Sequence, residues 1–180
     1  APHDREQASH DLKQAEAEIQ QAHIDELTGC YVRGIGTMAL QREIDRARHS
    51  DERLVLAFVD VDELKLVNDT FGHAAGDAIL SDVANAIRAK LRSYDPIVRV
   101  GGDEFICALS GIDVEMGQRR FAEIREVLRA DKDTSISVGF AALQRGDTLA
   151  DLTARGDEAL YRAKRERLQA REEDGSADQS

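Results

Sequence analysis

The sequence predicts an α/β fold of the α+β type, in which a mixed central sheet is flanked by helices and follows an N-terminal helical extension. Short apolar runs of strand length alternate with longer segments of helical periodicity. Two of these runs flank the Gly-Gly pair at 101–102, a pattern typical of a β-hairpin and hence of antiparallel pairing. Hydrophobic residues occupy 42% of the 180 positions, which is enough for the core of one ordinary domain.

The first predicted element is a helix within residues 1–24, where Ala, Gln and Glu favour helix formation. Its apolar residues recur at spacings of four and three, which is the pattern of a heptad seam: Ala8, Leu12, Ala15, Ile19 and Ala22. Because the seam is short and rich in alanine, a plain surface helix and a dimeric coiled-coil signalling stalk are both consistent with it.

A break at 27–29 ends this helix, and the other elements follow in order. Helices are predicted at 37–49, 63–69, 73–92, 114–129 and 149–168, and strands at 54–59, 97–100, 105–109 and 135–140. The strand at 54–59 is apolar throughout, which is typical of a buried central strand. Residues 169–180 are polar and are predicted to be a disordered tail, so the folded domain covers 25–168.

Composition limits the function. The formal net charge is −11, from 35 acidic and 24 basic residues, which argues against a general nucleic-acid binder. A nucleotide substrate stays compatible with this charge, because a bound divalent cation can invert the local field. Cys30 and Cys107 show no metal-binding or redox spacing, and no apolar run approaches the roughly 20 residues of a membrane span. We therefore expect a cytoplasmic protein, or the cytoplasmic part of a larger one.

Two aspartates close the predicted buried strand. Strand alternation places Asp60 and Asp62 on the same side, and an acid leaving an apolar strand is costly without a partner. A divalent metal is the favoured partner for Asp60, whereas Asp62 is equally consistent with a cap on the next helix. The N-terminus of that helix, with Lys65 nearby, is well suited to phosphate oxygens.

Two further acids, Asp103 and Glu104, follow the Gly-Gly pair. Hairpin turns often combine Gly with Asp, but two adjacent acids are harder to explain by turn chemistry alone. A strand-end aspartate beside a hairpin carboxylate is the arrangement that holds two Mg²⁺ ions for phosphoryl transfer. The strand-end aspartate and the hairpin acids together are specific evidence for such a metal site, whereas either feature alone is weak evidence.

Other polar groups have competing interpretations. His73 and Asp77 share a helix face, and Asn68 with Asp77 could bind the edge of guanine, although helix caps and glycine turns explain these residues better by spacing alone. An arginine can bind guanine O6 and N7, but Arg92 is explained more simply as a helix-terminal charge. Lys164 is explained most simply as a solvated helix residue.

Taken together, these residues resemble the GGDEF family of diguanylate cyclases over about residues 25–164. The motifs occur in the family's order: Asp25-Glu26-Leu27-Thr28-Gly29, Asp60-Val61-Asp62, Asn68-Asp69, Gly72-His73 with Gly76-Asp77, Gly101-Gly102-Asp103-Glu104-Phe105, and Asp157-Glu158-Ala159-Leu160-Tyr161 with Lys164. Each motif is weak alone, but six in order make chance similarity very improbable.

The resemblance implies a fold like the palm of polymerases and class III nucleotidyl cyclases. It also implies a homodimer in which two GTP-loaded domains meet face to face. Each 3′-hydroxyl attacks the α-phosphate of the other GTP, which yields cyclic di-GMP and two pyrophosphates. An upstream sensory or regulatory domain is expected as a partner, and neither nucleic acid nor a membrane segment in this chain is expected.

The resemblance also assigns roles. Asp60, the Val61 carbonyl and Asp103 are expected to hold Mg²⁺ or Mn²⁺, two ions per active site. The expected catalytic residues are Asp103, Glu104 and Lys65, with one or both acids assisting deprotonation of the 3′-hydroxyl.

Substrate and product contacts follow from the same resemblance. Asn68 and Asp77 are expected to bind guanine, and His73 to lie near the ribose. Lys65 and Lys164 are expected to neutralise phosphates, and Leu64, where Phe is common in the family, is expected beside the substrate. Arg92 and Asp95 stand at the spacing of the family's product-inhibition site, which predicts feedback inhibition by cyclic di-GMP.

One departure concerns the phosphates. The basic residue that the family usually has four positions after Lys164 is Leu168 here, so Arg165 or Arg167 is the candidate replacement. An inactive receptor that binds cyclic di-GMP or GTP is the alternative function, but the retained Asp60, Asp103 and Glu104 favour an active cyclase. A cyclase that uses ATP is disfavoured by Asp77, because adenine has no N1–H donor for a carboxylate.

Overall fold

The computed structural model describes residues 23–177, and side chains as far as residue 172. The predicted N-terminal helix with its heptad seam lies almost entirely outside the described residues. The elements in chain order are β1 (Tyr31–Val32), α2 (Arg33–Ser50), β2 (Leu54–Val61), α3 (Leu64–Phe71), α4 (His73–Lys90), β3 (Ile97–Arg99), β4 (Glu104–Ser110), α5 (Val114–Lys132), β5 (Ile136–Ala142) and α6 (Leu149–Ala177).

The strands form one mixed sheet in the order β1-β3-β4-β2-β5. β1 pairs with β3 in parallel and all other pairs are antiparallel, which confirms the predicted mixed sheet. The predicted hairpin is present, because Arg99 of β3 pairs with Phe105 of β4 across the Gly-Gly turn. β1 was not predicted, since two residues carry no readable periodicity.

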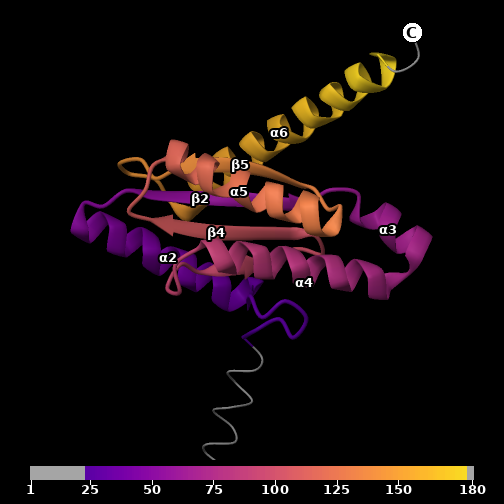
Figure 1. Ribbon diagram of the computed structural model, residues 1–180. Helices are drawn as coiled ribbons and strands as arrows, with labels where there is room; N and C mark the ends of the chain where they lie inside the picture. Colours follow the sequence, from indigo (N-terminus) through magenta and orange to yellow (C-terminus); the bar gives the residue numbers. More distant parts are fainter. Residues whose placement is uncertain (1–22, 178–180) are drawn as a thin grey trace, which may run out of the picture.

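Helices cover both faces of the sheet (Figure 1). On one face, alternate residues of β2 such as Val55 and Val59 join a core with α4 and α5. On the other face, Leu56 and Phe58 pack with α2 and α6. Every residue of β2 is buried, as expected for a central strand, and each large aliphatic side chain so buried contributes about 1.5–3 kcal/mol.

Two glycines let α6 lie close to the sheet. A Cβ atom on Gly156 would come within 2.0 Å of the Phe58 ring, and one on Gly139 within 2.2 Å of the Leu160 backbone nitrogen. The close approach that these glycines permit sets the height of α6 above β2 and β5, and hence the position of Lys164 above the end of β2.

Several boundaries differ from the prediction, and three of the differences bear on the candidate sites. β2 continues to Val61, so Asp60 belongs to the strand itself. α4 ends at Lys90, and Arg92 therefore lies in a loop and is not a helix-terminal charge. α6 continues to Ala177 past the predicted end at residue 168, because Gln, Ala, Arg and Glu after that point favour a helix. Residues 169–177 of the predicted tail are thus helical.

Figure 1 shows where α3 and α6 lie relative to the sheet. α3 lies beyond the end of β2, and α6 projects away from the sheet on the same side of the domain. Within residues 23–177, no helix is both long enough and apolar enough to cross a membrane.

Candidate active site

Asp60 lies at the centre of the candidate site. In the sheet it stands opposite Glu104 of β4 and Ser137 of β5, and it is only 6% exposed. Its Oδ2 atom lies 2.6 Å from Nζ of Lys164 on α6. Burial raises the pKa of Asp60, and the nearby Asp103 and Asp62 raise it further, while Lys164 opposes the shift. Burial is thus the main cause of the raised pKa, and the two neighbouring carboxylates add negative charge at the strand end.

Asp62, like Asp60, contacts a basic side chain of α6, which confirms that the two aspartates lie on the same side of the chain. Its two carboxylate oxygens accept hydrogen bonds from the hydroxyls of Ser135 and Ser137, at 2.6 and 2.7 Å. Nε of Arg167 lies 3.3 Å from Asp62 Oδ1, and the Asp62 side chain is only 2% exposed. The alternative interpretation of Asp62 as a helix cap is wrong, because the N-cap of α3 is Glu63 and no side chain caps that helix.

The hairpin turn brings its two acids to the end of β2. The Asp103 carbonyl accepts a hydrogen bond from the Val61 N–H at 3.0 Å, and the Glu104 carbonyl accepts one from the Val100 N–H at 3.0 Å. Glu104 is paired directly with Asp60, so the two side chains emerge on the same face. A Cβ atom on Gly101 would lie 2.7 Å from Glu104 Oε2, which explains the glycine beside this carboxylate.

The donor atoms at this position suit a hard divalent cation. The carboxylates of Asp60 and Asp103 and the Val61 carbonyl are oxygen ligands, which Mg²⁺ prefers. Asp103 and Asp62 add negative charge around the buried Asp60 carboxylate, and a cation would relieve this repulsion. Among the described residues no three acidic, His or Cys side chains converge on one point. With two carboxylates and one backbone carbonyl from the chain, these residues would fit an ion that takes its remaining oxygen ligands from elsewhere.

The candidate guanine-binding residues lie where α3 meets α4. Oδ1 of Asn68 is buried and has no hydrogen-bond partner among the described residues. A Cβ atom on Gly76 would lie 2.0 Å from this oxygen, so the glycine lets Asn68 pack against the start of α4, next to Asp77. A buried acceptor without a donor costs about 1–3 kcal/mol, which suggests that a ligand N–H supplies the missing bond. Asp77 and His73 are exposed near this position and free to contact a ligand.

Leu64 and Lys65 begin α3 and differ in environment. The Leu64 side chain is 7% exposed and belongs to the core, so only its backbone can face a substrate. Lys65 is exposed. The Val67 N–H bonds to the Glu63 carbonyl, which leaves the N–H groups of the first turn of α3 for a ligand.

Basic residues follow Lys164 along α6. Nη1 of Arg167 lies 3.7 Å from Glu63 Oε1, and Arg171 pairs with the same oxygen. Leu168 is half-exposed, and the Arg165 guanidinium lies over the Tyr161 ring, 6.0 Å from its centre. Arg167 rather than Arg165 is thus on the side of the site. Sequence reasoning missed Arg171, because the helix was predicted to end before it.

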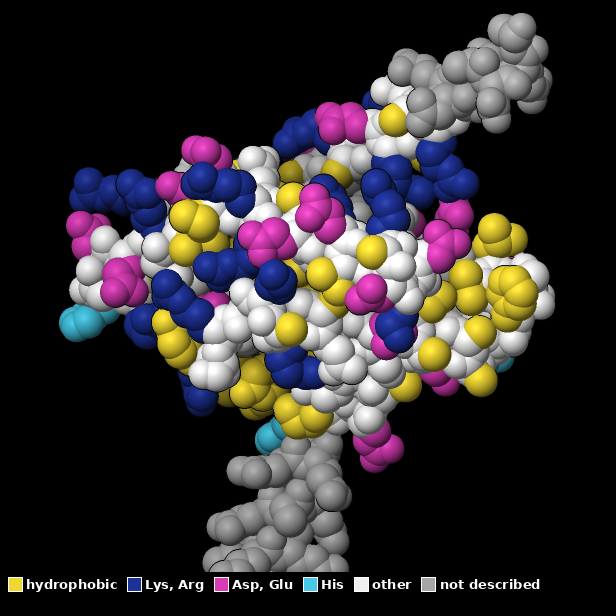
Figure 2. Space-filling model, in the orientation of Figure 1, with side chains coloured by type: hydrophobic (Ala, Val, Ile, Leu, Met, Phe, Trp, Pro, Cys, Tyr) yellow, Lys and Arg dark blue, Asp and Glu magenta, His cyan; other side chains and the backbone are white. Residues whose placement is uncertain are grey.

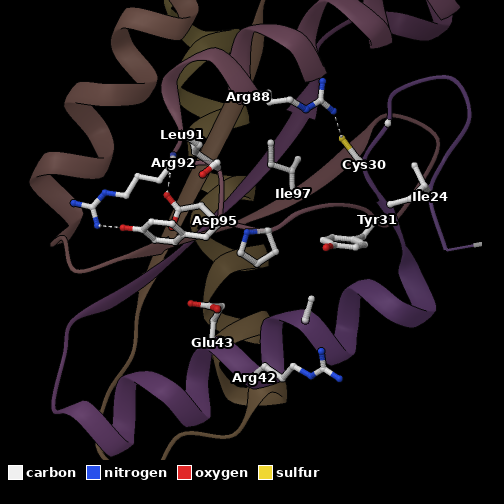
Figure 3. Close-up of a pocket in the computed structure, with 15 residues that line it drawn as sticks. Ile24, Cys30, Tyr31, Arg42, Glu43, Arg88, Leu91, Arg92, Asp95 and Ile97 are labelled. Atoms are coloured by element: carbon white, nitrogen blue, oxygen red, sulfur yellow. Dashed lines mark hydrogen bonds between the residues drawn. The ribbon is translucent and has the colours of Figure 1, made fainter. Parts of the chain in front are cut away.

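A separate cavity of about 580 Å³ lies beside the loop after α4 (Figure 3). Arg92 and Asp95 both line it, and Asp95 Oδ2 accepts a hydrogen bond from the Arg92 N–H at 3.1 Å. Nη1 of Arg92 donates to the Tyr94 hydroxyl at 2.9 Å and to the Ser110 carbonyl at 3.2 Å. Burial raises the pKa of Asp95, although the hydrogen bonds that its carboxylate accepts from the Arg92 and Ser110 N–H groups oppose the shift. The structure thus brings both predicted residues to one cavity, away from Asp60.

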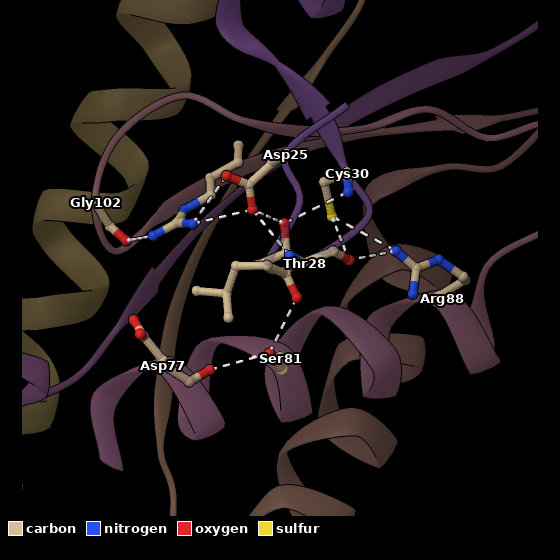
Figure 4. Close-up of polar contacts among 9 residues, drawn as sticks. Asp25, Thr28, Cys30, Asp77, Ser81, Arg88 and Gly102 are labelled. Carbon is tan, nitrogen blue, oxygen red and sulfur yellow. Dashed lines mark hydrogen bonds and ion pairs between the residues drawn. The ribbon is translucent and has the colours of Figure 1, made fainter. Parts of the chain in front are cut away.

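The loop at 25–30 is attached to α4 by polar contacts (Figure 4). The Ser81 hydroxyl donates to the Leu27 carbonyl at 3.1 Å, and Nη2 of Arg88 donates to the Thr28 carbonyl at 2.7 Å. The start of the domain is therefore fixed to the helix that carries Asp77.

Sequence comparison identifies relatives. The family model described as "Diguanylate cyclase, GGDEF domain" matches residues 22–169. The diguanylate cyclase TpbB of Pseudomonas aeruginosa is 36% identical over 156 residues, covering 81% of this chain and 36% of TpbB. The diguanylate cyclase DgcP of the same species is 34% identical over 154 residues, covering 81% of this chain and 23% of DgcP. The chain thus spans about a quarter to a third of the length of these relatives.

Solved structures agree with this assignment. The coiled coil and GGDEF domain of DgcB from Caulobacter crescentus, in complex with c-di-GMP, matches with a TM-score of 0.83 and 25% identity, covering 90% of this chain and 91% of that one. The diguanylate cyclase SiaD of Pseudomonas aeruginosa, in complex with its activator SiaC, matches with a TM-score of 0.76 and 30% identity, covering 90% of this chain and 66% of that one. The predicted palm-like fold is confirmed, and the chain belongs to the GGDEF family of diguanylate cyclases.

Proposed function

We propose that this domain condenses two GTP molecules into cyclic di-GMP and two pyrophosphates. One observation carries the proposal: the register of β2 with β4 places Asp60 directly opposite Glu104, beside Asp103, Lys164 and the start of α3. Four parts of the chain, β2, the β3–β4 hairpin, α3 and α6, thus meet at one point with the charges that phosphoryl transfer requires. Members of the family generally use divalent metal ions, and the donor atoms here fit them.

The residues divide the work. Asn68 and Asp77 hold guanine, with the unpartnered Asn68 oxygen accepting a base N–H. Lys65 and Lys164 hold phosphate oxygens, and Lys164 exchanges its contact with Asp60 for a contact with the nucleotide. Asp103, Glu104 or both accept the proton of the attacking 3′-hydroxyl. Asp60, the Val61 carbonyl and Asp103 would hold the divalent metal, for which we propose two ions per site, and the bound metal would supply positive charge to the transferring phosphoryl group.

The reaction requires two copies of the domain. Each site holds one GTP, and the attacking 3′-hydroxyl belongs to the GTP of the other copy, so we propose an active homodimer. An upstream segment or partner domain brings the copies together, as the length of the relatives suggests. We place the reaction in the cytoplasm, because its substrate is a cytoplasmic nucleotide.

Product inhibition is the second part of the proposal. Arg92 and Asp95 line one cavity outside the site of Asp60, which suits a regulatory ligand with guanine and phosphate groups. Cyclic di-GMP carries both groups, and we propose that it binds there and slows the enzyme.

The test is to incubate the protein with GTP and Mg²⁺ at concentrations that favour dimers and to identify the products. We expect pyrophosphate and cyclic di-GMP. Asp103→Ala should abolish both while circular dichroism and the melting temperature stay at the wild-type values. Binding of cyclic di-GMP or GTP without any turnover would instead support the receptor alternative and overturn the proposed activity.

A further inference from the structure

Three cations stand in a row along α6. Lys164, Arg167 and Arg171 follow one another at spacings of three and four, so they share one face of the helix. All three pair with acidic residues at the end of β2 or directly after it. Lys164 pairs with Asp60, Arg167 with Asp62 and Glu63, and Arg171 with Glu63. Lys and Arg side chains gather over α6 where it leaves the sheet (Figure 2). Arg171, the last cation of this row, lies in the part of α6 that the sequence predicted to be a disordered tail.

Glu63 is the residue on which the last two cations converge. Its φ of 59° and ψ of 18° put it in the left-handed region, which a non-glycine residue rarely adopts. Because Glu63 turns the chain directly into α3, its carboxylate lies at the helix end whose first N–H groups are free for an anion. The side chain of Glu63 thus occupies the surroundings in which nucleotide phosphates are expected.

The contacts of the two arginines are of a kind that phosphate can replace. The side chains of Arg171 and Glu63 are 59% and 41% exposed, and exposed ion pairs are weak. Nε of Arg167 is buried and lies 3.3 Å from Asp62, yet it makes no hydrogen bond with any described residue. A triphosphate offers several anionic oxygens, and a guanidinium binds such groups with two parallel hydrogen bonds.

We propose that Arg167 and Arg171 bind the terminal phosphates of GTP in this chain, and that Glu63 holds both arginines until the nucleotide displaces it. The inference rests on the proposed function. It also accounts for Leu168, which is apolar and half-exposed at the position where the family usually has a basic residue. In this chain the positive charge comes from the residues before and after that position, on the face of α6 that looks toward α3.

The proposal makes two substitutions act in opposite directions. Arg171→Ala removes a phosphate contact and weakens triphosphate binding, by about tenfold for one exposed charge-assisted contact. Glu63→Gln removes the competing carboxylate while it keeps the shape of the side chain, and it tightens triphosphate binding by about threefold. In the Arg171→Ala background, the same change at Glu63 has a smaller effect. A purely structural Arg171–Glu63 pair would make both substitutions act in the same direction.

The experiment measures equilibrium binding of 3′-deoxy-GTP with Mg²⁺, since this analogue has no 3′-hydroxyl and cannot condense. GMP serves as the second ligand, because it has only the phosphate nearest the ribose, and its affinity should not change in either variant. Arg162→Ala is the matched control: it removes an exposed arginine of α6 that pairs with Glu158 at 3.0 Å, and it should leave both affinities unchanged. Melting temperatures of all variants check the fold.

The outcomes separate this inference from the proposed function. If wild-type protein binds 3′-deoxy-GTP and condenses GTP, but Arg171→Ala binds the analogue as tightly as wild type, the assignment of Arg171 is wrong. Equal weakening of triphosphate and GMP would also overturn it, because the loss would then be structural. If wild-type protein neither binds nor condenses GTP, it is the proposed function that has failed.

Discussion

Arg99 joins Asp25 to the turn of the β3–β4 hairpin. Nη1 of Arg99 lies 3.0 and 3.1 Å from the two carboxylate oxygens of Asp25, and its Nη2 donates to the Gly102 carbonyl at 2.8 Å. The Thr28 hydroxyl and N–H also donate to Asp25, at 2.6 and 2.9 Å. One half-buried ion pair thus connects the first residues of the domain to the turn that carries Asp103.

This pair predicts a dependence of stability on pH. Burial raises the pKa of Asp25, but hydrogen bonds from Thr28 and Arg99 outweigh it and lower the pKa below the usual 3.8. The pair therefore stabilises the fold above pH 3.8, and this contribution is lost as the pH falls from there through the depressed value. Asp25→Asn should lower the free energy of unfolding by about 2 kcal/mol at pH 7. The stability of the variant should also fall less than that of wild type as the pH is lowered into the acid range. Urea unfolding at several pH values measures both, and a parallel acid loss in variant and wild type would contradict the prediction.

The glycines under α6 predict a graded loss of stability. Gly139→Ala places a Cβ atom against the Leu160 backbone, which cannot move alone, and Gly156→Ala places one against the Phe58 ring. We expect each to destabilise the protein by about 1–3 kcal/mol, with Gly139→Ala the more severe. Gly34→Ala in α2 is the control, since nothing lies within 4 Å of its added Cβ atom. This control should stabilise the helix by up to about 1 kcal/mol. Equal effects at Gly34 and Gly139 in thermal unfolding would refute the packing argument.

Local patterns predicted most of the fold. The apolar run before Asp60 and the Gly-Gly pair at 101–102 each indicate their element without tertiary information, and both elements are present. Ends of elements were less predictable, because caps and tertiary contacts decide them. α6 is the main example, since its polar extension beyond residue 168 has helical composition but no apolar periodicity that would distinguish it from a tail.

The site was predictable in its residue types but not in its geometry. The pairing of Asp60 with Glu104 depends on the register of two distant strands, which no local pattern contains. The burial of the Leu64 side chain and the Arg167–Glu63–Arg171 contacts depend on how α3 and α6 pack. Motif resemblance supplied the proposed roles of Asn68 and Asp77, for which spacing alone favoured turns and caps.

Guanine recognition predicts a change in base preference. If Asp77 accepts hydrogen bonds from guanine N1–H and N2–H, wild-type protein should use GTP better than inosine triphosphate, which has no 2-amino group. Asp77→Asn should reduce kcat/KM for GTP by roughly tenfold to a hundredfold. It should also lower the ratio of kcat/KM for GTP to kcat/KM for inosine triphosphate. Ser81→Ala, one turn along α4, is the control for changes in the helix. An unchanged ratio of the two kcat/KM values in Asp77→Asn would show that this carboxylate does not contact the base.

The unpartnered oxygen of Asn68 leads to a second prediction about guanine binding. This buried Oδ1 atom lacks a partner, so ligand binding relieves a cost that is present in the free protein. Asn68→Ala should therefore weaken GTP binding by about tenfold or more, while the free protein is destabilised less than is usual for loss of a buried polar side chain. Binding of 3′-deoxy-GTP and thermal unfolding measure the two quantities. A large loss of stability with unchanged affinity would assign Asn68 to the packing of α3 on α4 and remove it from the site.

The cavity at Arg92 predicts feedback that can be separated from turnover. Arg92 contacts Tyr94 and Ser110 through one guanidinium nitrogen, so the rest of the guanidinium can bind a ligand, and none of its hydrogen bonds reaches Asp60 or Asp103. Arg92→Ala should therefore keep the initial rate with GTP and abolish inhibition by added cyclic di-GMP, because the ligand loses its charge-assisted contacts there. Lys90→Ala is a suitable control, since that residue pairs with Glu123 at 2.7 Å on the neighbouring helix and does not line the cavity. Initial rates across a series of cyclic di-GMP concentrations give the answer. Undiminished inhibition in Arg92→Ala would place the regulatory site elsewhere, whereas a parallel loss of initial rate would mean that Arg92 supports the fold of the hairpin.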